Sequence, residues 1–345
     1  MPKSRLVFQH LALLAMMILI PLAASAQERK DAKLAQTGMK FLSVGVSARE
    51  AALADAFTAS YGKSASMFHN PAGMGALEGI ADVSLGSVNW IADIKQLYSS
   101  VAVKVGDVGV FGLSFQYADY GHIEATVLAN NTQGYLDIGE LKPSAFAVGF
   151  GYARSLTDKF SVGGTVKYVR QDLGNGITNA SYTGTAGSVS GVNALAENKN
   201  AVDVFAFDFG LLYQTGFRSL TLGMAVRNFA REVKYQKESF QLPLAFRLGA
   251  SMNMFDLLGF EREKQSLLLT VDAEHPRDFP EQMKVGLEYL FMNTVAARIG
   301  YVGPADEHNL SYGVGVQYKL LAVDYAYTPF GIFDNVQRFS VRMWF

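Results

Sequence analysis

From residue 80 to the C-terminus, the chain alternates large apolar residues with small or polar ones. The segment 111–118 reads FGLSFQYA, and the segment 205–213 reads FAFDFGLLY. A period of two over eight to ten residues predicts β-strands whose large apolar side chains share one face. Fourteen such segments are predicted: 80–89, 97–105, 108–121, 143–156, 159–173, 200–214, 218–229, 241–255, 265–275, 281–292, 295–303, 308–319, 320–328 and 336–345.

Short and long connections alternate between these predicted strands. The short ones are 106–107, 157–158, 215–217 and 293–294. The connections 122–142 and 174–199 are long. The connection 256–264 is an exception, because the alternation places it among the short turns although it is longer than they are. Transmembrane β-barrels have an even number of tilted strands of about 9–11 residues, with short periplasmic turns and longer external loops. The connection pattern therefore favours such a barrel.

The last predicted strand ends the chain on an aromatic residue. Phe339, Val341, Met343 and Phe345 alternate with polar or interfacial residues. A terminal aromatic residue on an alternating final strand resembles the signal by which outer-membrane barrels are recognised by their insertion machinery. We therefore expect these four residues to act as a membrane-insertion signal.

The small-residue face of the predicted strands distinguishes a barrel from a secreted β-sandwich, whose strands also alternate. A sandwich would expose that face to bulk water and fill it with Lys, Glu and Thr. Here it is rich in Gly, Ala and Ser with isolated charges of both signs, which suits a narrow lumen where charges pair. The predicted lumen charges are Lys167, Asp208, Arg227, Arg247, Asp272, Lys284, Glu288, Arg298, Asp324 and Arg342.

Composition agrees with this interpretation and excludes several classes of protein. The chain has 345 residues, 33 Gly, 24 Phe, 16 Tyr and no Cys, with 30 basic residues against 31 acidic ones. Without cysteine, neither a disulfide scaffold nor a thiolate zinc site can form. Near-neutral charge argues against an electrostatic nucleic-acid binder. After the apolar stretch at residues 11–22, the chain has no further apolar run of about 18 residues, so no helical membrane span is predicted.

The first 26 residues predict a secretory signal peptide. Lys3 and Arg5 precede an apolar stretch over 11–22, and Ala24-Ser25-Ala26 is a small-x-small cleavage signature. An exported chain of this kind is expected in the bacterial outer membrane, in contact with its lipid.

Residues 38–79 do not alternate and predict a helical hatch, inside the barrel or beneath it. Ser47 and Glu50 have the spacing of a capping box, so a helix is expected over 48–60, with a short second helix over 64–69. The expected domains are a signal peptide (1–26), a helical hatch (27–79) and a transmembrane barrel (80–345).

Five hatch residues are candidates for seating or gating. Arg49 and Glu50 would pair with lumen charges such as Asp208, Arg227 or Arg247. Asn70, Pro71 and Gly73 would shape a turn, because proline fixes φ and glycine permits unusual dihedral angles. The alternatives are simple helix capping for the first two residues and a purely structural turn for the other three.

The N-terminal region also carries a family resemblance. The stretches concerned are Phe41-Leu42, Ser47-Ala48-Arg49-Glu50-Ala51-Ala52, Ala54-Asp55-Ala56-Phe57-Thr58-Ala59 and Phe68-His69-Asn70-Pro71-Ala72-Gly73-Met74. They resemble the N-terminal signature of the PorV/PorQ family, which is related to the FadL-type barrels. The resemblance implies a 14-stranded antiparallel transmembrane β-barrel with a short N-terminal helical hatch. Asp55 and His69 depart from it, since glycine and an aromatic residue are more usual there.

Two functions follow from the resemblance. Characterised relatives act in type IX secretion, where such a barrel engages exported cargo or translocon proteins. The alternative is FadL-like uptake of hydrophobic small molecules. The connection 174–199 is mostly Gly, Asn, Thr, Ser and Ala, which predicts a flexible, solvated loop and weakens uptake. The connection 122–142 is more apolar and could line a small mouth.

Neither catalysis nor a cofactor is expected. The best acid and histidine constellation combines Asp272, Glu274 and His275 with Asp306 and His308. Solvated charges at the rim of the barrel explain these residues better than water activation does. The pair Gly149 and Gly151 is not followed by a helix and so predicts strand packing, not a nucleotide-binding loop.

Overall fold

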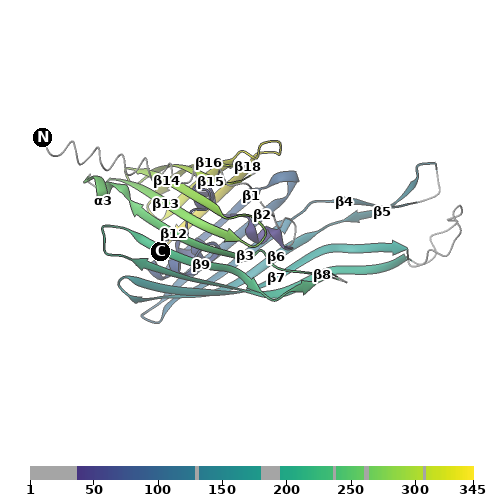
Figure 1. Ribbon diagram of the computed structural model, residues 1–345, viewed down its shortest axis with the longest axis horizontal. Coiled ribbons are helices and arrows are strands. Elements are labelled where there is room, and N and C mark those ends of the chain that lie inside the picture. Colours follow the sequence, from purple (N-terminus) through teal and green to yellow (C-terminus); the bar gives the residue numbers. More distant parts are fainter. Residues whose placement is uncertain (1–36, 129–131, 180–194, 236–237, 260–263, 306–307) are drawn as a thin grey trace.

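Fourteen antiparallel strands form a closed barrel in the computed structural model (Figure 1). The structure describes residues 37–128, 132–179, 195–235, 238–259, 264–305 and 308–345. The wall strands are β1 (Ala81–Asn89), β2 (Lys95–Val105), β3 (Gly109–Asp119), β6 (Ser144–Thr157), β7 (Phe160–Asn179), β8 (Leu195–Gln214), β9 (Thr221–Ala230), β12 (Ala245–Asn253), β13 (Gln265–Pro276), β14 (Gln282–Phe291), β15 (Val295–Gly303), β16 (Leu310–Tyr318), β17 (Leu321–Thr328) and β18 (Val336–Trp344).

The closure of this sheet confirms the predicted fold. Each predicted segment overlaps one wall strand, and β18 pairs with β1 from Asp82↔Trp344 to Asn89↔Gln337. The join at Lys319 is a tight turn in which that residue takes a φ of 51°. None of the helices among the described residues is long and apolar enough to cross a membrane.

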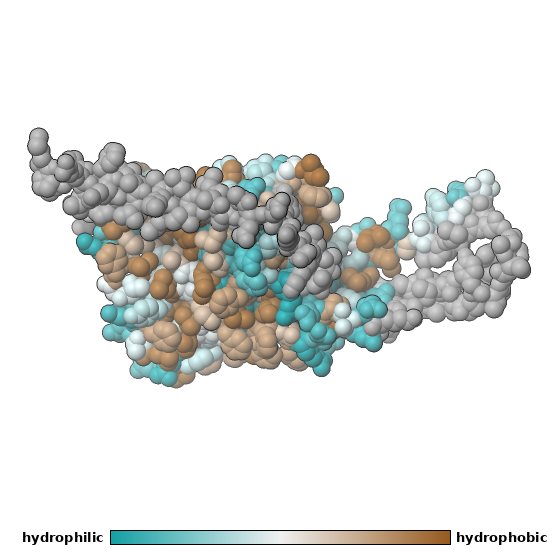
Figure 2. All heavy atoms as spheres, viewed as in Figure 1, coloured by the Kyte–Doolittle hydropathy of each residue, from teal (hydrophilic) through white to brown (hydrophobic). Residues whose placement is uncertain are grey.

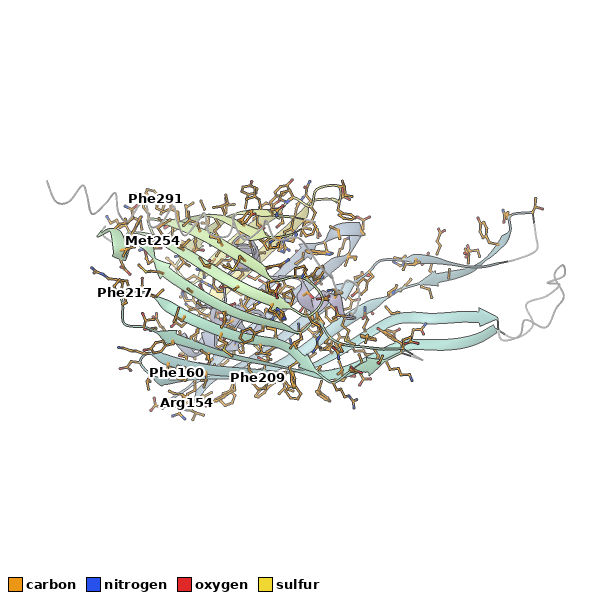
Figure 3. All side chains as sticks on the ribbon, viewed as in Figure 1. Arg154, Phe160, Phe209, Phe217, Met254 and Phe291 are labelled. Carbon is orange, nitrogen blue, oxygen red and sulfur yellow. The ribbon has the colours of Figure 1, made fainter. Side chains whose placement is uncertain are left out.

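The two ends of the barrel differ in their connections. One end, here called the short-turn end, carries the turns β2–β3, β6–β7, β8–β9, β14–β15 and β16–β17. Figure 3 labels Phe160, Phe217, Met254 and Phe291 there. The connection 256–264, which is longer than the other turns at this end, overlaps a short helix, α3 (Met254–Leu258). This helix is capped by Gly259, which has a φ of 74°. A local helix thus explains the extra length.

The opposite end, here called the long-loop end, carries two projecting arms (Figure 1). One is a hairpin of β4 (Ile123–Leu128) and β5 (Tyr135–Leu141). The other is formed by β7 and β8, which stay paired from the wall out to Asn179↔Leu195. The prediction of a flexible loop over 174–199 is therefore wrong for its two flanks, because the backbone ladder continues beyond the barrel. Its centre, 180–194, lies outside the described residues.

Smaller elements complete the long-loop end. A 3-10 turn, η4 (Ile91–Asp93), links β1 to β2, and a two-residue ladder joins β10 (Val233–Lys234) to β11 (Ser239–Phe240).

The two faces of the wall have opposite character. In β3 the even-numbered residues from Val110 to Ala118 are buried, whereas Leu113 and Phe115 are 58% and 41% exposed on the outside. Hydrophobic residues cover much of the visible barrel in Figure 2, and polar residues gather near the arms. An apolar outer band with a polar interior is the pattern of a barrel that faces lipid.

Residues 37–80, here called the N-terminal segment, lie in the lumen. They contain η1 (Lys40–Ser43), α2 (Ala48–Ala51), η2 (Lys63–Phe68) and η3 (Pro71–Ala76). Helix α2 contacts β16, β17 and β18, whereas η3 contacts β6, β7 and β8 across the barrel. Most side chains of these elements and of the residues between them are buried, among them Leu53, Phe57 and Met74. The segment therefore packs against opposite sides of the wall.

The helix predicted over 48–60 is wrong in length, because α2 ends at Ala51. Ala54 and Asp55 take left-handed φ values of 55° and 58°, which stops helical hydrogen bonding. The backbone N–H groups of Phe57 and Thr58 instead donate to Oδ2 of Asp272 on β13, each at 2.9 Å. Contacts with the wall thus replace local helical bonds.

Wall glycines allow the backbone of the N-terminal segment to approach closely. Gly112 and Gly151 lie against the side chains of Met67 and Met74. The inward glycines that lie against residues 52–59 or 70–72 are Gly163, Gly210, Gly223, Gly249, Gly286, Gly300 and Gly313. A Cβ atom at Gly163 would lie 2.6 Å from the backbone N of Ala72, and one at Gly223 would lie 2.7 Å from Cα of Ala59. Any larger side chain would displace the segment, so the inward glycines fit the lumen to it.

A pair of neighbouring glycines in β7 tests this fit. A Cβ atom at Gly163 overlaps the N-terminal segment, whereas one at Gly164 would meet nothing closer than 3.4 Å. Both substitutions by alanine restrict the unfolded chain equally. We expect Gly163→Ala to be less stable than Gly164→Ala by about 1–3 kcal/mol in urea unfolding of the purified barrel. Equal stability of the two variants would contradict the close fit.

Candidate functional site

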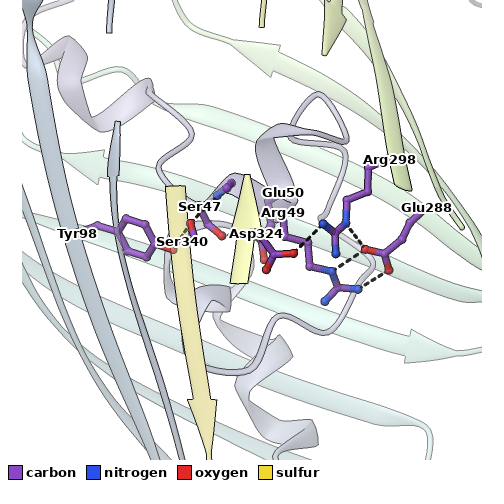
Figure 4. A network of polar contacts seen from close by, with 9 residues as sticks. Ser47, Arg49, Glu50, Tyr98, Glu288, Arg298, Asp324 and Ser340 are labelled. Atoms are coloured by element: carbon purple, nitrogen blue, oxygen red, sulfur yellow. Dashed lines mark hydrogen bonds and ion pairs between the residues drawn. The ribbon is translucent and has the colours of Figure 1, made fainter. Parts of the chain in front are cut away.

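Four charged side chains link the N-terminal segment to the wall (Figure 4). Nε and Nη2 of Arg49 donate to Oε2 and Oε1 of Glu288 at 2.9 and 2.8 Å. Nε of Arg298 donates to Oε2 of Glu288 at 2.5 Å, and its Nη1 donates to Oδ1 of Asp324 at 2.7 Å. Each wall member is at most 10% exposed in its side chain. Arg49 is therefore held by a fork-to-fork ion pair in a low-dielectric interior.

This arrangement differs from the partners expected for Arg49 and Glu50, which are Asp208, Arg227 and Arg247. Asp208 pairs with Lys167 at 2.8 Å and accepts the backbone N–H of Asn228 at 2.7 Å. Arg247 pairs with Glu274 at 3.0 Å, and Arg227 donates to the carbonyl of Leu42 at 3.3 Å. Asp208 and Arg247 are thus paired with other wall charges and Arg227 with a backbone carbonyl, whereas Glu288 on β14 receives Arg49.

The remaining predicted lumen charges also point inward. Lys284 bonds to Glu274, Asp272 accepts backbone N–H groups of the N-terminal segment, and Nε of Arg342 lies 3.9 Å from Oδ2 of Asp82. Arg342 is half-buried, and the other nine are buried. The ten residues do not form one cluster. Lys167 pairs with Asp208, Arg247 and Lys284 share Glu274, and Arg298 links Glu288 to Asp324. Arg227 and Asp272 bind backbone groups of the N-terminal segment, and Arg342 lies near Asp82.

Several wall residues that hold the N-terminal segment are not among the site residues predicted from the sequence. Nε of Arg338 donates to the carbonyl of Gly45 at 2.7 Å, and Ser340 accepts the N–H of Ala48 at 2.8 Å. Asp82 accepts the N–H of Ser64 at 3.0 Å, and Gln116 donates to the carbonyl of Phe41 at 2.8 Å. Their inward position follows from the alternation, but which backbone group each one meets does not.

Glu50 and Ser47 do not form the predicted capping box. The Ser47 hydroxyl donates to the Glu50 carboxylate instead of capping a backbone N–H group, since Ser340 of the wall already accepts the first N–H of α2. Glu50 is 2% exposed, and burial raises the pKa of its carboxyl group. Within the described residues, no basic side chain lies in ion-pair contact with it.

Asn70 and Pro71 begin the 3-10 helix η3 where a turn is expected, and Gly73 packs closely within it. The Asn70 amide donates to the carbonyls of Thr58 and Leu211 at 2.7 and 3.1 Å, and its Oδ1 accepts the N–H of Ala72. Pro71 begins η3. Gly73 has no positive φ, but a Cβ atom there would overlap Oγ of Ser66. Close packing, not an unusual dihedral angle, therefore requires this glycine.

His69 is a buried histidine without a hydrogen bond to either ring nitrogen among the described residues. It is 1% exposed and meets Phe57 edge-on, with ring centroids 6.0 Å apart. Burial lowers the pKa of its imidazole to about 3, although the negative charge of Asp55 acts in the opposite direction and favours the protonated ring. Arg227, Arg247 and Lys284 lower it further. The ring is therefore neutral at pH 7 and packs like the aromatic residues more usual at this position.

The residues considered for catalysis are separated. Asp272 and Glu274 face the lumen, whereas His275 points outward and lies 3.0 Å from Glu281. His308 stacks on Phe330 at 4.3 Å between ring centroids, and Asp306 lies outside the described residues. No shared reaction centre forms among the described members of this set.

Among the cavities lined by described residues, two lie on the short-turn side of the N-terminal segment. The larger, of about 380 Å³, is lined by Ser60 and Tyr61 together with the β6–β7 and β8–β9 turns. The smaller, of about 190 Å³, is lined by the Glu288, Arg298 and Asp324 group. Arg49 lines both cavities and so separates them.

The chain end completes the wall. Phe339 and Phe345 are 47% and 59% exposed on the outer face, which Val341 and Met343 share. The N–H of Phe345 donates to the carbonyl of Ala81 at 2.9 Å, so the terminal residue extends the β1–β18 seam. Recognition of these four residues by insertion machinery stays a prediction.

A closed fourteen-stranded barrel with an apolar outside and paired charges inside is an outer-membrane β-barrel protein. The family model of the type IX secretion system protein PorV matches residues 26–271. The chain belongs to the PorV family, which confirms the resemblance of its N-terminal region. No curated protein matches the sequence.

Solved structures share the fold at low identity. The toluene transporter TodX of Pseudomonas putida is 13% identical, with 83% of this chain and 94% of TodX covered and a TM-score of 0.54. The monoaromatic hydrocarbon channel CymD is also 13% identical, with 88% and 98% covered and a TM-score of 0.55. The barrel therefore has the FadL-like fold of these proteins.

The ion pair of Arg49 gives a first prediction for this site. Glu288→Gln leaves the buried Arg49 guanidinium without its anion, and breaking such a pair costs about 3–5 kcal/mol. We expect a lower urea midpoint and faster amide hydrogen exchange over residues 48–59. Glu281→Gln, at an exposed pair with His275, is the control and should change neither. Unchanged exchange in Glu288→Gln would show that the pair does not hold the segment.

The buried His69 gives a second prediction. Between about pH 3 and 6.5 the unfolded chain binds a proton at His69 that the folded chain does not. The free energy of unfolding should therefore fall with decreasing pH across this window, by up to about 1.4 kcal/mol per pH unit. His69→Phe should reduce that slope in urea unfolding measured from pH 7 to pH 4. The same slope in both proteins would contradict a neutral buried imidazole.

Proposed function

We propose that this barrel serves type IX secretion by binding exported proteins or translocon components at its long-loop end, with its lumen closed by its own N-terminal segment. The observation that carries the proposal is the occupation of the lumen. Met39, Phe41 and Leu42 are each at most 2% exposed and form one apolar cluster with wall residues such as Val169 and Val204. The chain itself fills the space that an apolar solute would need.

Tethers on several strands support a closed resting state. The N–H of Gly38 donates to the carbonyl of Gln241 at 3.0 Å, and Lys40 pairs with Asp278 at the long-loop end. Further along, Arg338 and Glu288 hold Gly45 and Arg49. A solute could pass only after many of these contacts broke together, which disfavours a conduit.

The arms at the long-loop end support a role in binding proteins. The β4–β5 hairpin and the β7–β8 extension project beyond the barrel (Figure 1). Ile123, Tyr135 and Leu173 are 50%, 48% and 39% exposed on them. Ordered arms with exposed apolar side chains resemble surfaces that bind other proteins. In this proposal residues 1–26 are a cleaved signal peptide, and the short-turn end faces the periplasm.

FadL-like uptake of hydrophobic small molecules is the second candidate. The likeness to TodX and CymD favours it, but at 13% identity that likeness extends to the fold alone. Uptake would require displacement of Met39, Phe41 and Leu42.

Replacing residues 123–141 with a short Gly-Ser linker tests the proposal in cells. We expect the variant to insert as a folded barrel but to lose co-purification with type IX secretion components, and extracellular cargo should fall. The control carries the same linker inserted between Met292 and Asn293 at the short-turn end. Normal cargo export by the hairpin variant would contradict the proposal. Toluene uptake that depends on this chain would favour the second candidate.

A further inference from the structure

The larger cavity at the short-turn end contains positive charge without an acidic counterpart. Its lining includes Arg49, Lys159 and Arg218, and none of its lining residues is Asp or Glu. Arg49 is neutralised by Glu288, which faces the smaller cavity. Within the described part of the chain, neither Lys159 nor Arg218 has an ion-pair partner. Two uncompensated cations therefore border this space.

Hydrogen-bonded turns fix the backbone positions of Lys159 and Arg218. In the β8–β9 turn, the N–H of Thr215 donates to the carbonyl of Leu220 at 3.1 Å, and Arg218 takes a left-handed φ of 53°. Such a backbone is uncommon for a residue other than glycine and has an energetic cost. Lys159 belongs to the neighbouring turn, and its carbonyl accepts the N–H of Gln214 at 2.7 Å. The two turns are thus joined through β8.

The Lys159 ammonium group lies over the β8–β9 turn. A Cβ atom at Gly216 would lie 3.0 Å from its Nζ, so this glycine leaves room for the ammonium group two residues from Arg218. The two cations therefore belong to adjoining turns at one edge of the cavity.

The rest of the lining supplies a hydrogen-bond donor and an apolar surface. The side-chain amide of Gln214 donates Nε2–H to the Tyr61 hydroxyl at 2.8 Å. Among the described residues, the hydroxyl hydrogen of Tyr61 is therefore available for donation to a ligand. Leu220 and Leu268 add aliphatic surface. A volume of about 380 Å³ lies within the range of small-molecule sites.

We propose that this cavity binds a small organic anion, with its carboxylate or phosphate held by Lys159 and Arg218 and its apolar body against Leu220 and Leu268. Charge-assisted bonds from two cations favour an oxyanion over a neutral ligand of the same shape. The site lies on the opposite side of the N-terminal segment from the arms, so the inference is independent of the proposed role in secretion.

Binding of 4-fluorobenzoate, followed by fluorine NMR on the full-length barrel in non-ionic detergent, tests the proposal. Its neutral analogue 4-fluorobenzamide measures partition into the micelle. We expect saturable binding of the benzoate and none of the benzamide. The double variant Lys159→Gln and Arg218→Gln should weaken benzoate binding about tenfold. Inorganic phosphate should compete with the benzoate, since both carry the oxyanion.

A matched pair of cations controls for general charge attraction. Lys104 and Arg154 lie near the same end of the barrel, and neither lines either cavity. The double variant Lys104→Gln and Arg154→Gln should bind 4-fluorobenzoate as the unchanged chain does. Equal weakening in the two double variants, equal binding of benzamide and benzoate, or no saturable benzoate binding would each overturn the proposal.

Discussion

The structure depends on close contact between the N-terminal segment and a wall that carries inward glycines on seven of its strands where the segment lies against it. Residues 52–59 and 70–72 lie against inward glycines of β7, β8, β9, β12, β14, β15 and β16. Such an approach leaves no room for side chains, so the segment obtains its hydrogen bonds from the wall, as Phe57 and Thr58 do from Asp272. The abundance of glycine beside Phe and Tyr thus has a spatial basis, since many aromatics of the wall strands, such as Phe115 and Phe150, face outward.

Paired charges inside the barrel help to hold the N-terminal segment against the wall. Burial of a charge is costly unless it is paired, and breaking such a pair costs more than the pair contributes by itself. Glu288 holds Arg49 of the segment and Arg298 of the wall together, so the buried ion pairs specify where the segment lies. An apolar cluster around Phe41 lies near the arms, and the cavity bordered by Lys159 and Arg218 lies at the short turns. Secretion and anion binding would therefore use different halves of the barrel.

The wall could be predicted from the sequence because a period of two fixes strands and faces locally. The inward position of Glu288 and Arg338 follows from that alternation. The conformation of the N-terminal segment could not be predicted in this way. Ser47 and Glu50 have the spacing of a capping box, yet Ser340, almost three hundred residues away, accepts the first helical N–H. The left-handed Asp55 and the Arg49 partner likewise depend on contacts between distant parts of the chain.

The central claim is that residues 37–80 close the lumen. Single-channel conductance in planar bilayers measures this directly, by comparing the intact barrel with a barrel that lacks residues 38–75. We expect little current through the intact chain and a clear rise in conductance after the deletion, provided that the deleted barrel migrates as a folded species. Equal conductance in the two proteins would contradict closure of the lumen by this segment.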